Sequence, residues 1–405
     1  MISRVTSYVR QFDRQLWILS LGWFVGALGF AASIPFISIY FHDRMGLSMT
    51  QIGLFFGAMA VVRAVFQVIG GELSDRFGRR GLLIYAQYAR TLAFVATGLG
   101  IHYDVGFWWM AGLVTLNYIF GAMFFPAVSA LVSDILPGAK RLDGYAITRA
   151  AGNFGWAAGP AIGGFMAHNS YASLFYLSAF IILVSGLVFQ FAFTNPPQTK
   201  THGAFKLSDL TALGRDTNLA VHCLLSFALY LVVAQLVAPL SVYTVEMVGI
   251  PEAKLGLLFA INGCMVTALQ IPITKAAGGL RFTTQLAFGA MLYLIGYGSL
   301  GLFNQYWYFV MIIMVVTTGE MLISPPSLTL VSRLAPEGRM GRYMGVYGFF
   351  MTGGWSFGPL YGGWLLDSFS HNHTLAWMLI SSLALVAAVG FLVFGRRLDD
   401  RLNRK

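Results

Sequence analysis

Long apolar runs separated by short polar segments dominate the chain, and each run has about the 20 residues that a helix needs to cross a bilayer. The runs lie near 16–41, 50–72, 82–102, 106–133, 144–166, 172–193, 218–244, 254–276, 284–303, 307–330, 343–365 and 375–395. Six runs precede a polar segment and six follow it. The pattern predicts an all-α membrane protein with a six-helix bundle over 1–193, a central loop over 194–217, and a second six-helix bundle with a short basic tail over 218–405.

The two halves resemble each other in sequence. The segment Pro126–Gly164 returns 199 positions later as Pro325–Gly363, and the two align without a gap. A repeat of this length indicates that the chain consists of two copies of one unit.

Each copy of the repeat ends in glycines spaced four residues apart, accompanied by a proline. These positions are Gly155, Gly159, Pro160 and Gly163 in the first copy, and Gly354, Gly358, Pro359 and Gly362 in the second. On a helix this spacing forms a smooth face that another backbone can approach closely. Such a face also occurs in ordinary packing of membrane helices, but its recurrence favours a paired element between the halves that takes part in gating.

Composition and charge support a membrane location. Hydrophobic residues make up 57% of the 405 residues, charged residues only 10%, and the mean hydropathy is +0.70. Lys and Arg concentrate in the loops on one side, whereas the opposite loops carry only Arg44 and Lys254. This bias predicts that both termini are cytoplasmic, and it explains the net charge of +10 without a nucleic-acid partner. We expect a monomer in the plasma membrane, which in bacteria is the inner membrane.

An even number of runs, a two-fold repeat and a central loop describe a secondary transporter whose substrate site lies between two bundles. The loop after the second run strengthens this interpretation. It reads Gly71-Glu72-Leu73-Ser74-Asp75-Arg76-Phe77-Gly78-Arg79-Arg80. This segment resembles the GxLxDRxGRR signature of the major facilitator superfamily.

The resemblance implies a gate at this loop. In that family the acid meets a neighbouring helix, which implies that Asp75, Arg79 and Asp134 form a lock that holds the inner gate closed. Gly71 and Gly78 would permit close approach and a sharp turn. The alternative is that Arg76, Arg79 and Arg80 only anchor the loop on the cytoplasmic side.

Residues 155–164 resemble the fifth-helix motif of drug-exporting members of the superfamily, but the chain departs from the family pattern elsewhere. Ala146 stands where a glycine is usual, and the fourth-helix pattern Arg-x-x-x-Gly has become Asn117-x-x-x-Gly121. The first helix also lacks a buried acid. Because the family's arginine is tied to proton movement, these departures put proton coupling in doubt.

Of the 16 acidic residues, Glu320 alone lies well inside an apolar run. A carboxylate in this position costs about 2.5–3.5 kcal/mol on insertion scales, so it faces protein or a wet cavity by default. Removal from water favours its neutral form, which would let it take up and release a proton. We expect Glu320 to couple protons or bind a cation; a structural pair with an arginine is the alternative.

Other polar residues in the apolar runs are candidates for the substrate cavity. Arg63, Arg149 with Asn153 one turn on, Gln235, Tyr243, Asn262 and Gln270 could meet the substrate or could pair with neighbouring helices. Arg90 is expected to pair structurally or to reach toward the membrane surface. Aromatic residues, Trp23 and Tyr118 among them, would suit an amphipathic or cationic organic substrate.

The sequence contains no nucleotide-binding loop, nucleophile elbow or metal signature, and it predicts neither an enzyme nor a metal site. We expect no cofactor, with the proton as coupling ion and a small molecule as substrate. The leading hypothesis is proton-coupled efflux of a small amphipathic compound or drug by alternating access. Uptake or facilitated diffusion of a metabolite, and a receptor that does not transport, remain alternatives.

Overall fold

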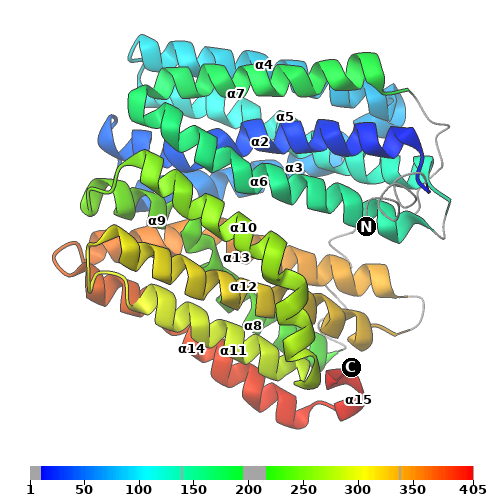
Figure 1. The fold of residues 1–405 in the computed structure, drawn as a ribbon, viewed down its shortest axis with the longest axis vertical. Helices are drawn as coiled ribbons and strands as arrows, with labels where there is room; N and C mark the ends of the chain where they lie inside the picture. The colour runs from blue at the N-terminus through cyan, green and yellow to red at the C-terminus, as the bar shows by residue number, and fades with distance from the viewer. Residues whose placement is uncertain (1–10, 138–139, 195–215, 337–338, 405) are drawn as a thin grey trace. The chain divides into compact units, whose positions relative to one another are not determined.

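Helices account for the architecture in a computed structural model that describes residues 11–137, 140–194, 216–336 and 339–404 (Figure 1). The first half contains α2 (Arg14–Asp43), α3 (Met49–Phe77), α4 (Arg79–His102), α5 (Phe107–Ile135), α6 (Arg141–Asn169) and α7 (Tyr171–Leu187), which η2 (Val188–Ala192) continues. The second half contains α8 (Thr217–Val233), η4 (Ala234–Leu236), α9 (Pro239–Val242), η5 (Tyr243–Met247), α10 (Glu252–Ala276), η6 (Ala277–Gly279), α11 (Phe282–Gly298), α12 (Tyr306–Leu334), α13 (Met340–Ser368), α14 (His373–Arg397) and α15 (Asp400–Asn403). No strand occurs among these residues.

Each of the twelve apolar runs coincides with a helix or a series of helical segments. The run 218–244 is the irregular one, because α8 passes through η4 before α9 begins at Pro239. Pro239 has no amide hydrogen to donate, which suits the first turn of a restarted helix. In the described part of the chain, eight helices are long and apolar enough to cross a membrane.

The helix boundaries repeat the duplication seen in the sequence. The helices α8, α10 and α11 begin 203 residues after α2, α3 and α4, and the helices α12 and α13 begin 199 residues after α5 and α6. The change of register falls between the third and fourth helices of each half. The duplication therefore extends well beyond the segment in which the residues themselves match.

The chain divides into two compact units. Unit 1 comprises Met1–Tyr40, Val61–Thr201 and Pro251–Gly263, and unit 2 comprises Phe41–Ala60, His202–Ile250 and Cys264–Lys405. The start of α3 thus packs with unit 2, and the start of α10 packs with unit 1. The expected domain limits at 193 and 218 stay a prediction.

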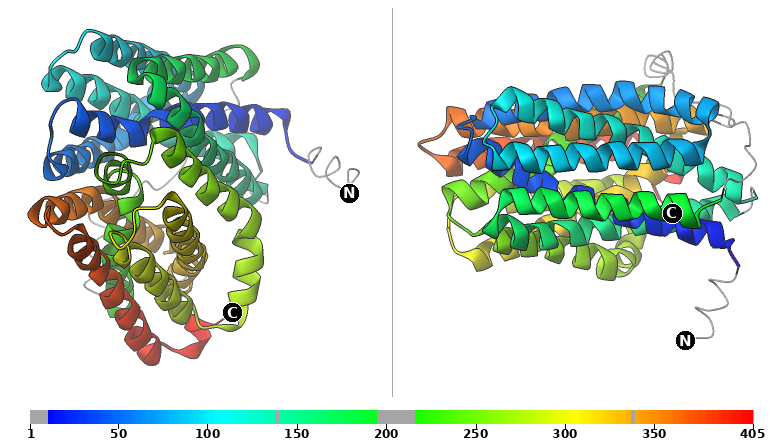
Figure 2. Two further views of the ribbon diagram at one scale, coloured as in Figure 1. Left: turned by 60° about the vertical axis from the view of Figure 1, so that its left-hand side comes forward. Right: turned by 90° about the horizontal axis from the view of Figure 1, so that it is seen from above.

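The two units use matching helix neighbours. In unit 1, α4 packs against α5 and α7, and Figures 1 and 2 both show α4 beside α7. In unit 2, α11 packs against α12 and α14, while α8 packs against α13. In unit 1, buried apolar side chains form a cluster that includes Leu16 of α2, Leu83 of α4 and Phe189 of η2.

The glycine faces of α6 and α13 pack on the first helix of their own unit. A methyl group at Gly159 would lie 2.8 Å from the backbone of Leu28 and Ala32 in α2. One at Gly358 would lie 2.5 Å from the Cβ of Ala234 and 2.8 Å from the Leu231 carbonyl oxygen, at the end of α8. The stripes therefore account for packing within a unit, and their role in a seal between halves stays a prediction.

Two further glycines mark helix crossings related by the duplication. A methyl group at Gly53 of α3 would lie 2.6 Å from the Pro359 carbonyl oxygen of α13, within unit 2. One at Gly256 of α10, 203 positions later, would lie 2.5 Å from the Pro160 carbonyl oxygen of α6, within unit 1. Each unit therefore contains one tight crossing between a glycine and a proline-bearing helix.

Polar contacts reinforce both crossings. The Asp367 carboxylate of α13 accepts hydrogen bonds from the amides of Met49 (3.0 Å) and Thr50 (2.7 Å), at the start of α3. This is a favourable place for a negative charge, because the first amides of a helix lack partners within the helix. At the other crossing, Glu252 accepts a hydrogen bond from the Tyr171 hydroxyl group at 3.1 Å and lies 3.4 Å from Nδ1 of His168.

Candidate functional site

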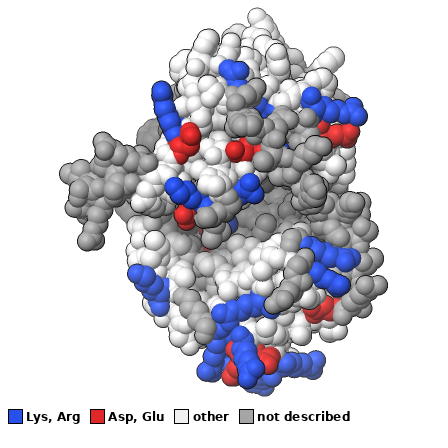
Figure 3. All heavy atoms as spheres, turned by 90° about the vertical axis from the view of Figure 1, so that its right-hand side faces the viewer, with Lys and Arg blue, Asp and Glu red and all other residues white. Residues whose placement is uncertain are grey.

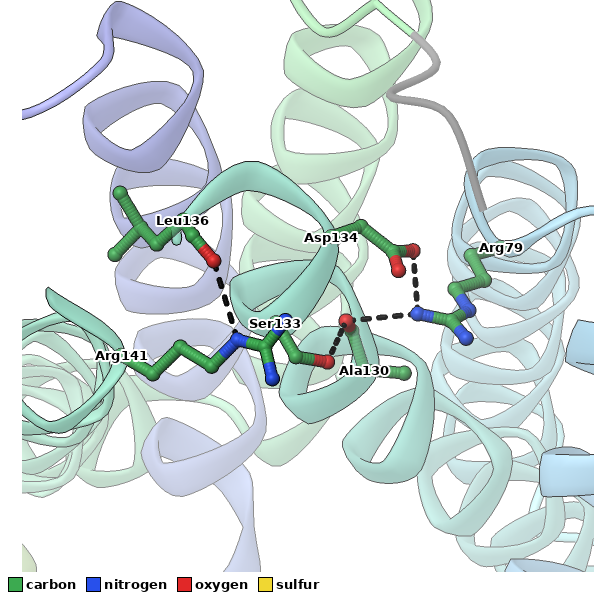
Figure 4. Close-up of polar contacts among 6 residues, drawn as sticks. All are labelled: Arg79, Ala130, Ser133, Asp134, Leu136 and Arg141. Atoms are coloured by element: carbon green, nitrogen blue, oxygen red, sulfur yellow. Dashed lines mark hydrogen bonds and ion pairs between the residues drawn. The ribbon is translucent and has the colours of Figure 1, made fainter. Parts of the chain in front are cut away.

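The loop between α3 and α4 brings part of the expected lock together. Gly78 has a φ of 87°, a left-handed conformation that glycine adopts without steric cost. The turn directs Arg79 into unit 1, where its side chain is 3% exposed and pairs with the fully buried Asp134 carboxylate (Figure 4). Arg79 also donates a 2.8 Å hydrogen bond to the Ala130 carbonyl oxygen. The side chain of Asp75 lies outside the described residues.

Other basic residues near this loop donate hydrogen bonds to carbonyl groups at the carboxyl ends of helices. Arg141 donates to the Leu136 carbonyl oxygen at 3.1 Å (Figure 4), and Arg80 donates to the Phe189 carbonyl oxygen at 3.3 Å. Arg76 forms an exposed pair with Glu72. Cations at carboxyl ends of helices are stabilised by the unpaired carbonyl groups there. Figure 3 shows Lys and Arg gathered in several groups on one face of the molecule.

The glycines of this loop differ in their surroundings. Gly78 requires its unusual backbone angle, whereas a methyl group at Gly71 would meet no described atom within 4 Å. Gly71 therefore makes no close approach within the described structure, although the motif led us to expect one.

A cavity with two arginines and several aromatic side chains lies within unit 1. It holds about 550 Å³ of empty space, open solvent included. Five helices, α2 to α6, contribute its lining, which comprises Trp23, Gly26, Ala27, Phe30, Arg63, Arg90, Tyr118, Gly121, Ala122 and Trp156. The Phe30 ring is central, with Tyr118 at 5.5 Å and Trp156 at 5.9 Å between ring centroids, both edge to face.

Arg90 forms the buried end of this cavity. Its side chain donates to the Asn117 side-chain oxygen at 3.3 Å and to the Gln87 side-chain oxygen at 3.0 Å. Its guanidinium carbon lies 5.1 Å from the centre of the Phe30 ring. Gly121 leaves room for it, since a methyl group there would lie 3.6 Å from the Arg90 Nε atom.

The structure brings only some of the expected cavity residues to this place. Arg63 lines the cavity and Asn117 binds Arg90, whereas Arg149 and Asn153 are exposed and do not contribute to the lining. Sequence reasoning did not assign Arg90, Phe30 or Trp156 to the cavity. The sequence offered one signal for this wall of the cavity. Gly26 and Phe30 are four residues apart, so they lie on one face of α2.

The polar candidates of the second half support packing between helices. Gln235 is fully buried, and its amide donates to the Leu231 and Gly358 carbonyl oxygens, both at 2.7 Å. Tyr243 is buried among Phe309, His373 and Trp377.

The two candidates on α10 are half-buried. Gln270 donates to the Met321 carbonyl oxygen at 3.1 Å and so joins α10 to α12. Asn262 lies two turns earlier on the same helix.

Glu320 lies in α12, five residues before the first of two prolines within that helix. Its side chain is half-buried and interacts electrostatically with the phenol groups of Tyr293 and Tyr297, which α11 contributes. Glu320 therefore lies within electrostatic range of two buried tyrosines in unit 2.

Comparison with known proteins identifies the family. The family model of the Major Facilitator Superfamily matches residues 19–359, which is most of the chain. The chain belongs to the major facilitator superfamily. Membership confirms the resemblance that the sequence motifs indicated, and it makes the protein a multi-pass membrane transporter for small molecules.

Relatives of similar length agree with this assignment. The chain is 29% identical to the uncharacterized MFS-type transporter YttB of Bacillus subtilis, with 96% of each chain covered. It is 24% identical to the multidrug resistance protein MdtH of Shigella sonnei, with 92% of each covered. Among solved structures, the nucleoside transporter NupG superposes with a TM-score of 0.78 at 11% identity, covering 94% of this chain and all of that one. This likeness confirms the fold.

Within the superfamily's pattern, Asn117 replaces the arginine of the fourth helix. The structure places the Arg90 guanidinium group beside Asn117 at 3.3 Å. A positive charge is therefore present next to the substituted position, although it comes from the preceding helix.

Proposed function

We propose that this superfamily member is a secondary active transporter that exports a small amphipathic organic compound against proton entry by alternating access. The observation that carries the proposal is Glu320, the acid of an apolar helix, which is half-buried and within electrostatic range of Tyr293 and Tyr297. A carboxyl group that is shielded from water but still partly accessible can exchange a proton in step with a conformational change. The likeness to MdtH, named a multidrug resistance protein, supports the export of organic compounds.

Further support comes from the first half of the chain. Arg90 supplies a guanidinium group where the family pattern has its own arginine, so the departure at Asn117 leaves the charge in place. We also propose that the protein lies in the bacterial inner membrane with both termini cytoplasmic. This orientation follows from the distribution of Lys and Arg along the chain.

The test is substrate flux in proteoliposomes with and without an imposed pH gradient. A panel of amphipathic fluorescent dyes of either charge would serve as substrates. We expect flux that the gradient drives in the parent protein and a loss of at least about tenfold for Glu320→Gln. The amide has nearly the same shape as the carboxyl group but cannot release a proton.

Asp104→Asn is the matched control, since it makes the same chemical change in a loop. Asp104 has a φ of 49°, which asparagine tolerates well, so the variant should fold. Gradient-independent flux would instead show a facilitator, which the lack of a buried acid in the first helix favours. Absence of flux for every dye would favour a receptor.

A further inference from the structure

The middle parts of the helices of unit 1 carry arginines but no acids. Arg63, Arg90 and Arg149 lie within α3, α4 and α6, whereas the acidic residues of α2 to α7 fall within two turns of a helix end. A cation away from water is costly unless an anion or several hydrogen-bond acceptors compensate it. The helices themselves supply no such anion in their middle.

Arg90 shows the imbalance most clearly. Its side chain is 5% exposed, and the acceptors that it meets, Asn117 and Gln87, are neutral amides. Two amide oxygens satisfy part of the five donors of a guanidinium group but leave its charge uncompensated. Arg90 has no ion pair among the described residues.

The second charge comes from Arg63, which lines the same cavity. Arg63 reaches the cavity from α3, is exposed, and lies within electrostatic range of Tyr118. It too lacks an ion pair in the part of the chain that the structure describes. Two guanidinium groups therefore border one cavity, and both are able to bind a carboxylate or sulfonate through paired N–H donors.

Aromatic rings form the rest of the wall. Tyr118 and Trp156 each lie edge to face with Phe30, and Trp23 lines the same cavity. These rings suit a flat apolar group. A ligand with a positive charge would meet two arginines with no compensating acid.

We propose that this cavity binds an aromatic organic anion, with Arg90 and Arg63 at the anionic group and Phe30, Tyr118 and Trp156 around the ring. The inference rests on the proposed function, because it names the chemical class of the exported compound. It replaces the expectation of a cationic substrate that the aromatic residues alone suggested.

Binding of three naphthalene probes to the purified protein in neutral detergent tests the charge preference. The probes are 2-naphthalenesulfonate, the neutral 2-naphthalenesulfonamide and the cationic 2-naphthylmethylammonium ion, which share one ring system. We expect the sulfonate to bind at least about tenfold more tightly than the cation, with the sulfonamide between them. Equal affinities, or tighter binding of the cation, would overturn the proposal.

Substitutions assign the preference to the cavity. Arg63→Gln should lower sulfonate affinity about tenfold while leaving the sulfonamide nearly unchanged, and it should fold because Arg63 makes no described hydrogen bond. Arg90→Gln should do the same, and Arg90→Lys should retain part of the preference. Arg44→Gln, which removes an exposed loop charge, is the control. An equal loss in this control would refute the assignment to the cavity.

Two further outcomes separate the proposals. Displacement of the sulfonate by phosphatidylglycerol but not by phosphatidylcholine would place a lipid headgroup in the cavity and overturn the substrate assignment. Sulfonate binding without flux of any dye would refute the transport proposal and leave the anion site intact. Flux of dyes together with equal binding of the three probes would refute the anion site and leave the transport proposal intact.

Discussion

At the scale of single residues, two buried arginines of this protein have different kinds of partner. Arg79 has a carboxylate partner, Asp134, and both side chains are almost entirely buried. Arg90 is equally buried but has amide partners alone among the described residues. The first arrangement stabilises the structure locally, whereas the second leaves a charge for a ligand.

The buried pair allows a stability prediction. Asp134→Asn removes the negative charge but leaves Arg79 buried, and such a change typically costs about 3 kcal/mol or more. We expect a clear drop in the melting temperature of the detergent-solubilised protein. The double variant Arg79→Met with Asp134→Leu should recover part of the loss, because it removes both charges. No recovery would mean that the pair stabilises the fold through more than charge compensation.

At the scale of helices, glycine spacing decides how closely two backbones approach. The contacts of Gly358 with Ala234 and Leu231 leave no room for a side chain, whereas Gly348 in the same helix meets no described atom within 4 Å. The two glycines therefore lie in one helix but differ in how closely other segments approach them.

This contrast leads to a matched pair of variants. Gly358→Ala should destabilise the protein by about 1–3 kcal/mol, since the added methyl group forces α13 away from α8. Gly348→Ala should cause no loss, because alanine favours the helix and meets open space. Thermal unfolding of both variants in detergent provides the measurement. Equal effects would show that the α13–α8 contact is looser than the structure indicates.

At the scale of the whole molecule, α3 and α10 each contribute to both units. The first part of α3 packs with unit 2 and the remainder with unit 1, and α10 does the reverse. In an alternating-access transporter such helices must exchange contacts during the cycle. We therefore expect the Asp367 cap on the start of α3 to hold one state of the proposed cycle.

Cross-linking tests this role. In a background without the exposed Cys264, we expect a short thiol-specific cross-link between Thr50→Cys and Asp367→Cys to lower flux at least about tenfold. Each single-cysteine variant treated in the same way should retain flux. Unchanged flux in the cross-linked double variant would show that this crossing stays closed throughout the cycle.

The sequence by itself determined the positions of the helices, the duplication and the superfamily, because these depend on local hydropathy and on short motifs. The Gly78 turn was likewise predicted from the motif, and the Arg79–Asp134 pair was what the resemblance to the superfamily implied. Tertiary structure alone decided that the glycine stripes pack on α2 and α8 and that Gln235 joins helices. It also placed Arg90 beside Asn117. Spacing along one helix shows which residues share a face but not which helix that face meets, because the partner depends on packing between segments far apart in the chain.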